Sequence, residues 1–149
     1  SNILERFFYP LNEETNIKIN QIFRKLTKNK KQSIKILEIK GRAFTIKDYF
    51  EGITKFDFNF LCNQNIGAED YIKIAEVCDF IVIENIPKFN DENINKQQRF
   101  ITLIDILYEK KISLMTSSFE SLENFGSSRA LVAPFKRTLS RLYELTSTS

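Results

Sequence analysis

The sequence contains no histidine, and this absence excludes a wide range of chemistry. Without imidazole there is no Ser-His or Cys-His nucleophile pair, no imidazole general base and no basis for most transition-metal sites. The two cysteines, Cys62 and Cys78, form no CxxC pair, so their pattern does not predict a zinc site. We expect both to be reduced, buried thiols.

Glycine is also scarce, and its distribution excludes the common phosphate-binding loops. The chain has four glycines, which are too far apart to form either GxGxxG or GxxxxGK[ST]. Paired acids do occur, at Glu69-Asp70 and at Asp91-Glu92. Because acids at the start of a helix complement its dipole, we interpret both pairs as helix caps rather than catalytic dyads. The sequence therefore predicts no catalytic residue, no metal site and no cofactor site in this chain.

Long hydrophobic runs are missing as well. The chain has 149 residues, of which 42% are hydrophobic and 28% are charged, a size and composition that fit one domain with its own core. No apolar run approaches the roughly eighteen residues that a membrane span needs. We therefore expect no membrane span and no signal peptide, and predict a soluble cytoplasmic protein.

The net charge of +3 is small and comes partly from one local run, Lys28, Lys30 and Lys31. A solvated loop is one interpretation of this run. Binding of phosphate, of an acidic partner or of nucleic acid, with Lys25 included, is the alternative, and nucleic acid is the least favoured partner. Such binding would weaken steeply with salt.

The centre of the chain has the pattern of a strand, a helix and a second strand. Residues 80–83 form a short apolar run closed by Pro87, and residues 112–115 form another, both typical of buried strands. Between them, residues 97–111 carry apolar groups at helical spacing. The pattern predicts a βαβ unit with two parallel strands.

The flanking segments complete a mixed α/β (α+β) fold. Asn12 is expected to cap an N-terminal helix, and Gly41 to permit the tight turn of a β-hairpin that has a bulge near residues 36–37. Phe56 and Phe58 are expected on the core face of one strand. The remaining predicted elements are an apolar entry at residues 7–11, the N-terminal helix to residue 26, hairpin strands at 33–39 and 43–46, a strand at 53–58, a helix at 67–78, a short helix or turn ending near 126, a loop to 134 and a C-terminal helix at 138–145.

Asp105 is the most informative ionisable residue, because it lies in the middle of the predicted helix 97–111. If the face of the helix that carries it is covered, an unpaired carboxylate is costly, so it should meet a cation. Arg137 and Arg141 are the candidates. Alternatively, Asp105 faces water on a polar stripe with Thr102 and Glu109.

A second polar feature is Thr116-Ser117-Ser118, which follows the second central strand. These residues could form a polar sensing position at the strand end. The favoured interpretation is that they only end the strand in a turn.

Taken in order, the residues resemble the C-terminal part of the ZapE-type cell-division ATPases, whose mitochondrial relatives include the lactation-elevated ATPase. The match extends almost from end to end. It includes Tyr9-Pro10-Leu11, Gly41-Arg42, Phe56, Phe58, Leu61-Cys62, Gly67-Ala68, Asp70-Tyr71, Ile74-Ala75, Ile86-Pro87, Arg99-Phe100, Leu103-Ile104-Asp105, Leu107-Tyr108, Arg137-Thr138, Ser140-Arg141-Leu142 and Glu144. One departure is Gln98, where the family has a second basic residue before Arg99.

The resemblance implies that residues 1–149 form a single C-terminal domain and that a P-loop module with the Walker motifs, absent from this chain, precedes it in a complete family member. ATP and magnesium are implied for the full-length family, while this chain alone should be inactive. The missing module and, in bacteria, the tubulin-like FtsZ at the division site are the implied partners. Mitochondrial relatives act in protein quality control.

Three functions stay open at this level. The chain is a non-catalytic domain that couples a motor to a partner, a free-standing interaction module from a split gene, or a weak binder of an acidic partner or nucleic acid through its lysines. Arg99, Asp105, Arg137 and Arg141 are the residues we expect in coupling contacts or structural ion pairs. The arginines could contact nucleotide phosphates, another subunit, or only acidic groups of this chain.

Overall fold

A six-stranded sheet forms the centre of the molecule in the computed structural model, which describes residues 6–147. The strand order is β1-β6-β5-β4-β3-β2. Strands β1, β6, β5 and β4 are parallel neighbours, and β3 and β2 continue the sheet in antiparallel pairs. The strands are β1 (Phe7–Phe8), β2 (Gln32–Ile39), β3 (Arg42–Phe50), β4 (Ile53–Asp57), β5 (Phe80–Ile86) and β6 (Ser113–Ser118).

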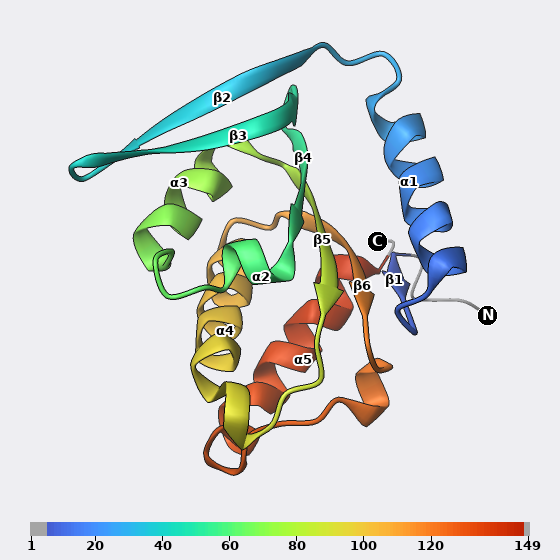
Figure 1. Cartoon of the computed structure of the whole chain (residues 1–149), viewed down its shortest axis with the longest axis vertical. Coiled ribbons are helices and arrows are strands. Elements are labelled where there is room, and N and C mark those ends of the chain that lie inside the picture. The colour runs from blue at the N-terminus through green and yellow to red at the C-terminus, as the bar shows by residue number, and fades with distance from the viewer. Residues whose placement is uncertain (1–5, 148–149) are drawn as a thin grey trace.

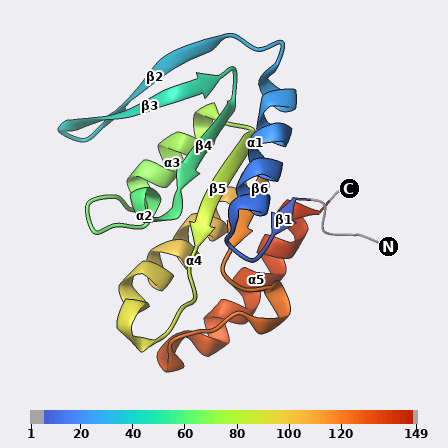
Figure 2. The same cartoon turned by 45° about the vertical axis from the view of Figure 1, so that its right-hand side comes forward.

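Helices cover both faces of this sheet (Figures 1 and 2). On one face, Ile19 of α1 packs against Val82 and Met115. The other helices enclose the larger core on the opposite face. The helices are α1 (Glu13–Thr27), α2 (Phe58–Leu61), α3 (Ala68–Val77), α4 (Ile94–Glu109) and α5 (Val132–Thr146). Within the described residues, no helix has the length and apolar character that crossing a membrane requires.

The predicted βαβ unit is confirmed. β5 and β6 are parallel neighbours, paired for example through Val82 and Met115, and α4 connects them. The mixed α/β fold class is confirmed with it, including the N-terminal helix, the hairpin and the C-terminal helix. Asn12 caps α1 as expected, because its side chain accepts a hydrogen bond of 2.9 Å from the Thr15 N–H.

The hairpin forms where glycine predicted it. Gly41 has φ +71° in the turn between β2 and β3, a conformation that glycine adopts without a steric penalty. The predicted bulge at residues 36–37 is wrong, because the register shift lies between Ser33 and Lys35. Ile36 and Leu37 pair regularly with β3.

Several element boundaries differ from the sequence interpretation, and the second hairpin strand, predicted at 43–46, extends over Arg42–Phe50. Phe58 is buried as expected, but it is the first residue of α2 and not the end of β4. Thr116, Ser117 and Ser118 belong to β6 and are fully buried, so the turn interpretation is wrong. Pairing with β5 on one side and β1 on the other extends the strand through these polar residues.

The C-terminal helix begins at Val132, six residues before the predicted start. Pro134 lies in its first turn, where the backbone N–H groups have no partner inside the helix, so proline is tolerated there. The predicted loop up to Pro134 is therefore too long. It also contains a short 3₁₀ turn, Arg129–Leu131. The 3₁₀ turn Leu122–Asn124 confirms the short helix or turn predicted to end near residue 126.

Phenylalanines form much of the core beneath the parallel strands. Five of them make successive ring contacts with centroids 5.5–6.0 Å apart, within the range that favours aromatic pairs. They come from α2, α4, α5 and two loops, so this cluster joins segments that are distant in the sequence. The five are Phe58, Phe89, Phe100, Phe125 and Phe135.

Candidate functional site

The contact between α4 and α5 brings Asp105 and Arg141 together. The Arg141 Nη1 group donates a 2.6 Å hydrogen bond to Asp105 Oδ1. Leu142, next to Arg141, is fully buried, so packing of the apolar side of α5 turns Arg141 toward α4. The Asp105 side chain retains 34% exposure and that of Arg141 25%. The pair is partly shielded from water, and Asp105 does not lie on a purely solvated stripe.

Arg137 lies one turn before Arg141 on α5 and has a much looser contact. Its Nη2 atom is 3.9 Å from Asp105 Oδ2, and its side chain is 62% exposed. An exposed pair at this distance is screened by water and contributes little to stability. Its guanidinium therefore remains accessible to another molecule.

Tyr108 and Glu144 extend the polar contact toward the end of the two helices. The Arg141 guanidinium lies over the Tyr108 ring at 4.6 Å, a cation–π contact. The Tyr108 hydroxyl donates to Glu144 Oε2 at 3.1 Å, and this hydrogen bond raises the pKa of Tyr108. We call Asp105, Tyr108, Arg137, Arg141 and Glu144 the α4–α5 seam.

The segment that leads into α5 is held on the beginning of α4. Buried Gln97 donates to Ser127 Oγ at 2.8 Å and accepts from the Ser128 N–H at 3.0 Å. Asp91 accepts 2.8 Å hydrogen bonds from the backbone N–H and the Nε of Arg129. The backbone bond and then the side-chain bond lower the pKa of Asp91. These contacts fix where α5 starts, and the sequence interpretation missed them because they join loops with no periodic pattern.

Arg99 is not part of the seam. It is half-buried, and its Nη1 donates to the backbone oxygen of Asn95 on its own helix at 3.4 Å. With Cys62, Asn63 and Lys96 it borders a hollow of about 480 Å³ between the α2–α3 loop and the start of α4. Within residues 6–147, no carboxylate lies within ion-pair distance of Arg99.

Both cysteines are free and buried, in agreement with the sequence interpretation. Burial raises the pKa of Cys62 and of Cys78 to about 12 in each case. At neutral pH both therefore remain protonated thiols, which are poor nucleophiles.

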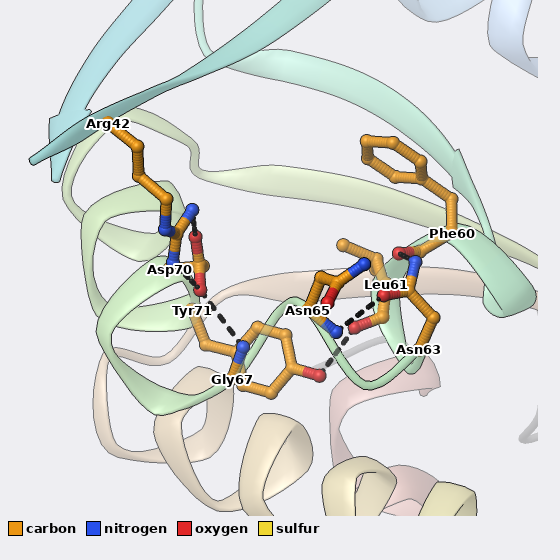
Figure 3. Close-up of polar contacts among 8 residues, drawn as sticks. All are labelled: Arg42, Phe60, Leu61, Asn63, Asn65, Gly67, Asp70 and Tyr71. Carbon is orange, nitrogen blue, oxygen red and sulfur yellow. Dashed lines mark hydrogen bonds and ion pairs between the residues drawn. The ribbon is translucent and has the colours of Figure 1, made fainter.

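Another arginine–aspartate pair, Arg42–Asp70, attaches the hairpin to α3 (Figure 3). Two guanidinium nitrogens of Arg42 contact the two carboxylate oxygens of Asp70 at 2.6 and 2.7 Å. The Gly67 N–H donates to Asp70 Oδ2 at 2.9 Å, which also caps the helix. Burial acts to raise the pKa of Asp70, but the bonds from Arg42 and Gly67 outweigh it and lower that pKa below its ordinary 3.8.

The loop between α2 and α3 is fixed beside this pair (Figure 3). The Tyr71 hydroxyl donates to the Leu61 backbone oxygen at 2.5 Å. Asn63 accepts from the Asn65 N–H at 2.8 Å and donates to the Phe60 backbone oxygen at 3.0 Å. Burial raises the pKa of Tyr71 well above its ordinary value. Several of the residue pairs that carry the family resemblance, from the hairpin turn to α3, thus form one structural unit.

Sequence reasoning identified Asp70 only as an acid at a helix start and did not predict its partner. The only available signal was that Arg42 directly follows the hairpin glycine while Asp70 is the third residue of a helix capped by Gly67. The two are 28 residues apart, so no periodic pattern could connect them.

The described residues form a mixed α/β fold. Arginine–aspartate pairs connect the hairpin to α3 and α5 to α4. The sequence has neither GxGxxG nor GxxxxGK[ST]. The AFG1-like ATPase family model matches residues 3–149, and the chain belongs to that family. The sequence resemblance to the ZapE and lactation-elevated type is confirmed by this match.

Two curated relatives illustrate the relationship. Lactation elevated protein 1 homolog B of Danio rerio is 31% identical over 99 residues, which cover 65% of this chain and 20% of that protein. Cell division protein ZapE of Escherichia coli K12 is 26% identical over 138 residues, which cover 93% of this chain and 37% of that protein. The chain thus spans well under half the length of either relative. No solved structure matches it.

Acidic side chains lie at two of the helix starts, the position at which a helix can bind a phosphate group. The Asp70 carboxylate occupies the Gly67 N–H at the start of α3, and Asp91 and Glu92 precede α4. Both helix starts would therefore repel a phosphate, which needs free N–H groups there. Within the described residues, no three His, Cys, Asp or Glu side chains group as a metal site would require.

Proposed function

We propose that this chain is the non-catalytic C-terminal region of an AFG1-like ATPase and that it transmits the state of a nucleotide-binding module to a partner. The observation that carries this proposal is Arg137. It lies 3.9 Å from Asp105 and remains 62% exposed on α5, which is attached by the Arg141–Asp105 contact and, just before its start, by the Arg129–Asp91 contact. Such an arginine presents a charge at a defined position.

The nucleotide, magnesium and catalytic groups would come from a P-loop module outside this sequence. That module is the first partner we propose, since the chain covers only part of its relatives and its helix starts carry acids. Arg137 would contact either nucleotide phosphates or an acidic group of the module or of another subunit. Arg141 would orient Arg137 through the shared Asp105.

Similarity to cell division protein ZapE supports a more specific role. We propose that the protein is bacterial, works in the cytoplasm and is recruited to the division site, with an FtsZ-like protein as a further partner. The relationship to lactation elevated protein 1 leaves protein quality control as the other cellular setting.

Titration of the purified chain with MgATP in a calorimeter tests whether nucleotide binding requires a module outside this sequence. We expect no binding heat, whereas magnesium-dependent binding by the chain alone would overturn the proposal. An absence of Walker motifs from the complete product of the gene would also overturn it and would favour a free-standing interaction module.

Arg137→Ala in the complete gene product tests whether Arg137 couples this region to the nucleotide-binding module. We expect it to lower ATP hydrolysis severalfold, because a positioned charge is removed. Lys136→Ala is the matched control, since Lys136 is the exposed neighbour on the same turn. Equal hydrolysis by the wild type and both variants would exclude coupling through Arg137.

A further inference from the structure

The outer strand of the sheet, β2, has an open edge. It is the last strand of the order β1-β6-β5-β4-β3-β2, and in Figures 1 and 2 no described segment runs along its outer side. Backbone N–H and C=O groups on that side lack a strand partner, which makes an exposed edge a template for a further strand. Pairing with β3 is regular from Lys35 to Ile39, after the irregularity at Ser33.

The side chains of β2 are unusually apolar for an edge strand. Ile34 and Ile36 are 66% and 59% exposed. They alternate with Leu37 and Ile39, which are buried on the face that packs toward α3. Because alternate residues share a face, Ile34 and Ile36 form an apolar pair on the opposite, uncovered face of the hairpin.

Positive charge is concentrated around this strand. Residues 28–51 contain seven basic residues and three acids, a net charge of +4, although the whole chain carries only +3. Two of the acids, Asp48 and Glu51, accept hydrogen bonds from the Gln32 side chain and the Lys31 N–H. Arg42 is neutralised by Asp70, and Lys40 is 4.0 Å from Glu69. The other five form no ion pair with a described carboxylate. They are Lys28, Lys30, Lys31, Lys35 and Lys47.

We propose that the edge of β2 binds an extended, acidic segment of a partner protein, which adds to the sheet as a seventh strand. The backbone of Lys35–Ile39 would supply the hydrogen bonds, and Ile34 and Ile36 the apolar contact. The unpaired lysines at the start of β2 would attract the acidic groups. This site lies at the opposite edge of the sheet from β1 and is separate from the α4–α5 seam.

Charge and exposed apolar surface favour an acidic polypeptide at the β2 edge over a second copy of this chain or a nucleic acid. A second copy of the chain would place another 28–51 segment, of net charge +4, against the first, so like-charge repulsion opposes self-pairing. A nucleic acid would use the lysines but would gain nothing from two exposed isoleucines beside an open strand edge. An acidic extended polypeptide would use the lysines, the exposed isoleucines and the open strand edge together.

A fluorescein-labelled ten-residue peptide of alternating valine and glutamate is the probe, and anisotropy is the measurement. We expect the wild-type chain to bind it and to ignore a valine–lysine peptide of the same length. Ile36→Lys should weaken binding about tenfold through the loss of apolar contact, even though it adds a positive charge. Ile17→Lys is the matched control, because Ile17 is an exposed isoleucine on α1, and it should leave binding unchanged.

Amide hydrogen exchange supplies the second measurement. Strand addition should slow exchange at residues 35–39, whereas attraction by charge alone should not. Absence of peptide binding, unchanged or tighter binding by Ile36→Lys, or unprotected amides at residues 35–39 would overturn the proposal. So would a dimer of the chain that excludes the peptide, or tighter binding of a single-stranded oligonucleotide than of the acidic peptide. Circular dichroism checks that Ile36→Lys folds, which its exposure leads us to expect.

Discussion

The Arg42–Asp70 pair, which we call the hairpin joint, and the α4–α5 seam both use arginine and aspartate, in different surroundings. At the hairpin joint, the Asp70 side chain is 1% exposed and both of its oxygens contact Arg42. In the seam, Asp105 is 34% exposed and divides its oxygens between a close Arg141 and a distant Arg137. Removing the partner of a buried charge destabilises a protein far more than removing the partner of an exposed charge, so the stability of the fold depends on the Arg42–Asp70 pair. The seam leaves one arginine available for contacts.

The largest effect is expected at the hairpin joint. Arg42→Leu would leave the Asp70 carboxylate buried with only the Gly67 N–H, whereas Asp70→Asn leaves an arginine that can turn to water. Asp70→Asn should lower the free energy of unfolding by about 1–3 kcal/mol, and Arg42→Leu should lower it more. Urea denaturation measures both, with Lys40→Leu as an exposed hairpin control. The reverse order would show that Asp70 does not depend on Arg42.

Low pH should destabilise the wild type more than Asp70→Asn. The pKa of Asp70 in the folded protein lies below its ordinary 3.8, so the ionised carboxylate stabilises the fold above that pH. This contribution is lost as the pH falls through 3.8 toward the lower folded value. Between about pH 5 and pH 2.5 the wild type should therefore lose more stability than Asp70→Asn. Parallel losses in thermal melts of the two proteins would contradict the assignment.

The seam should respond more weakly. A double-mutant cycle with Asp105→Asn and Arg141→Leu should give a coupling energy of about 1 kcal/mol, because the pair is close but partly solvated. Equilibrium denaturation of the four proteins supplies the cycle. Additive effects of the two substitutions would mean that the 2.6 Å contact contributes nothing to stability.

Arg137→Ala should change the free energy of unfolding least, by less than about 0.5 kcal/mol, because the side chain is exposed and its contact with Asp105 is long. The same denaturation assay measures it. A loss as large as that of Arg141→Leu would place Arg137 with the structural residues and remove the reason to expect a coupling role.

The comparison also separates what the sequence could predict from what it could not. The βαβ unit was predictable because apolar periodicity directly reflects burial of strands and helices. The start of α5 was not predictable, because proline is typical of a helix end although the first turn of a helix accepts it, as it does Pro134 here. The buried Thr116-Ser117-Ser118 was missed because polar residues in a strand between two neighbours give no apolar signal.

The candidate residues divide in the same way. Asp105 was identifiable because a carboxylate stood within an apolar helical pattern, and two arginines followed on the next predicted helix. Arg99 was predicted to act with these residues, but it borders the hollow beside the α2–α3 loop and lies outside the seam. The Arg42–Asp70 pair was outside reach, because its members carry no periodic signal and meet only when the hairpin folds over α3.

The sequence by itself determined the alternation of elements, the cap of α1 at Asn12 and the absence of phosphate-binding loops, because these depend on neighbouring residues. It did not determine the partner of Asp91, which accepts hydrogen bonds from Arg129 while Asn90 forms the cap. The tertiary structure alone decided which arginine each aspartate meets, which arginine stays exposed, and that Ile34 and Ile36 face outward on an open edge. Those properties depend on burial and distance between segments far apart in the chain, and no local pattern encodes either.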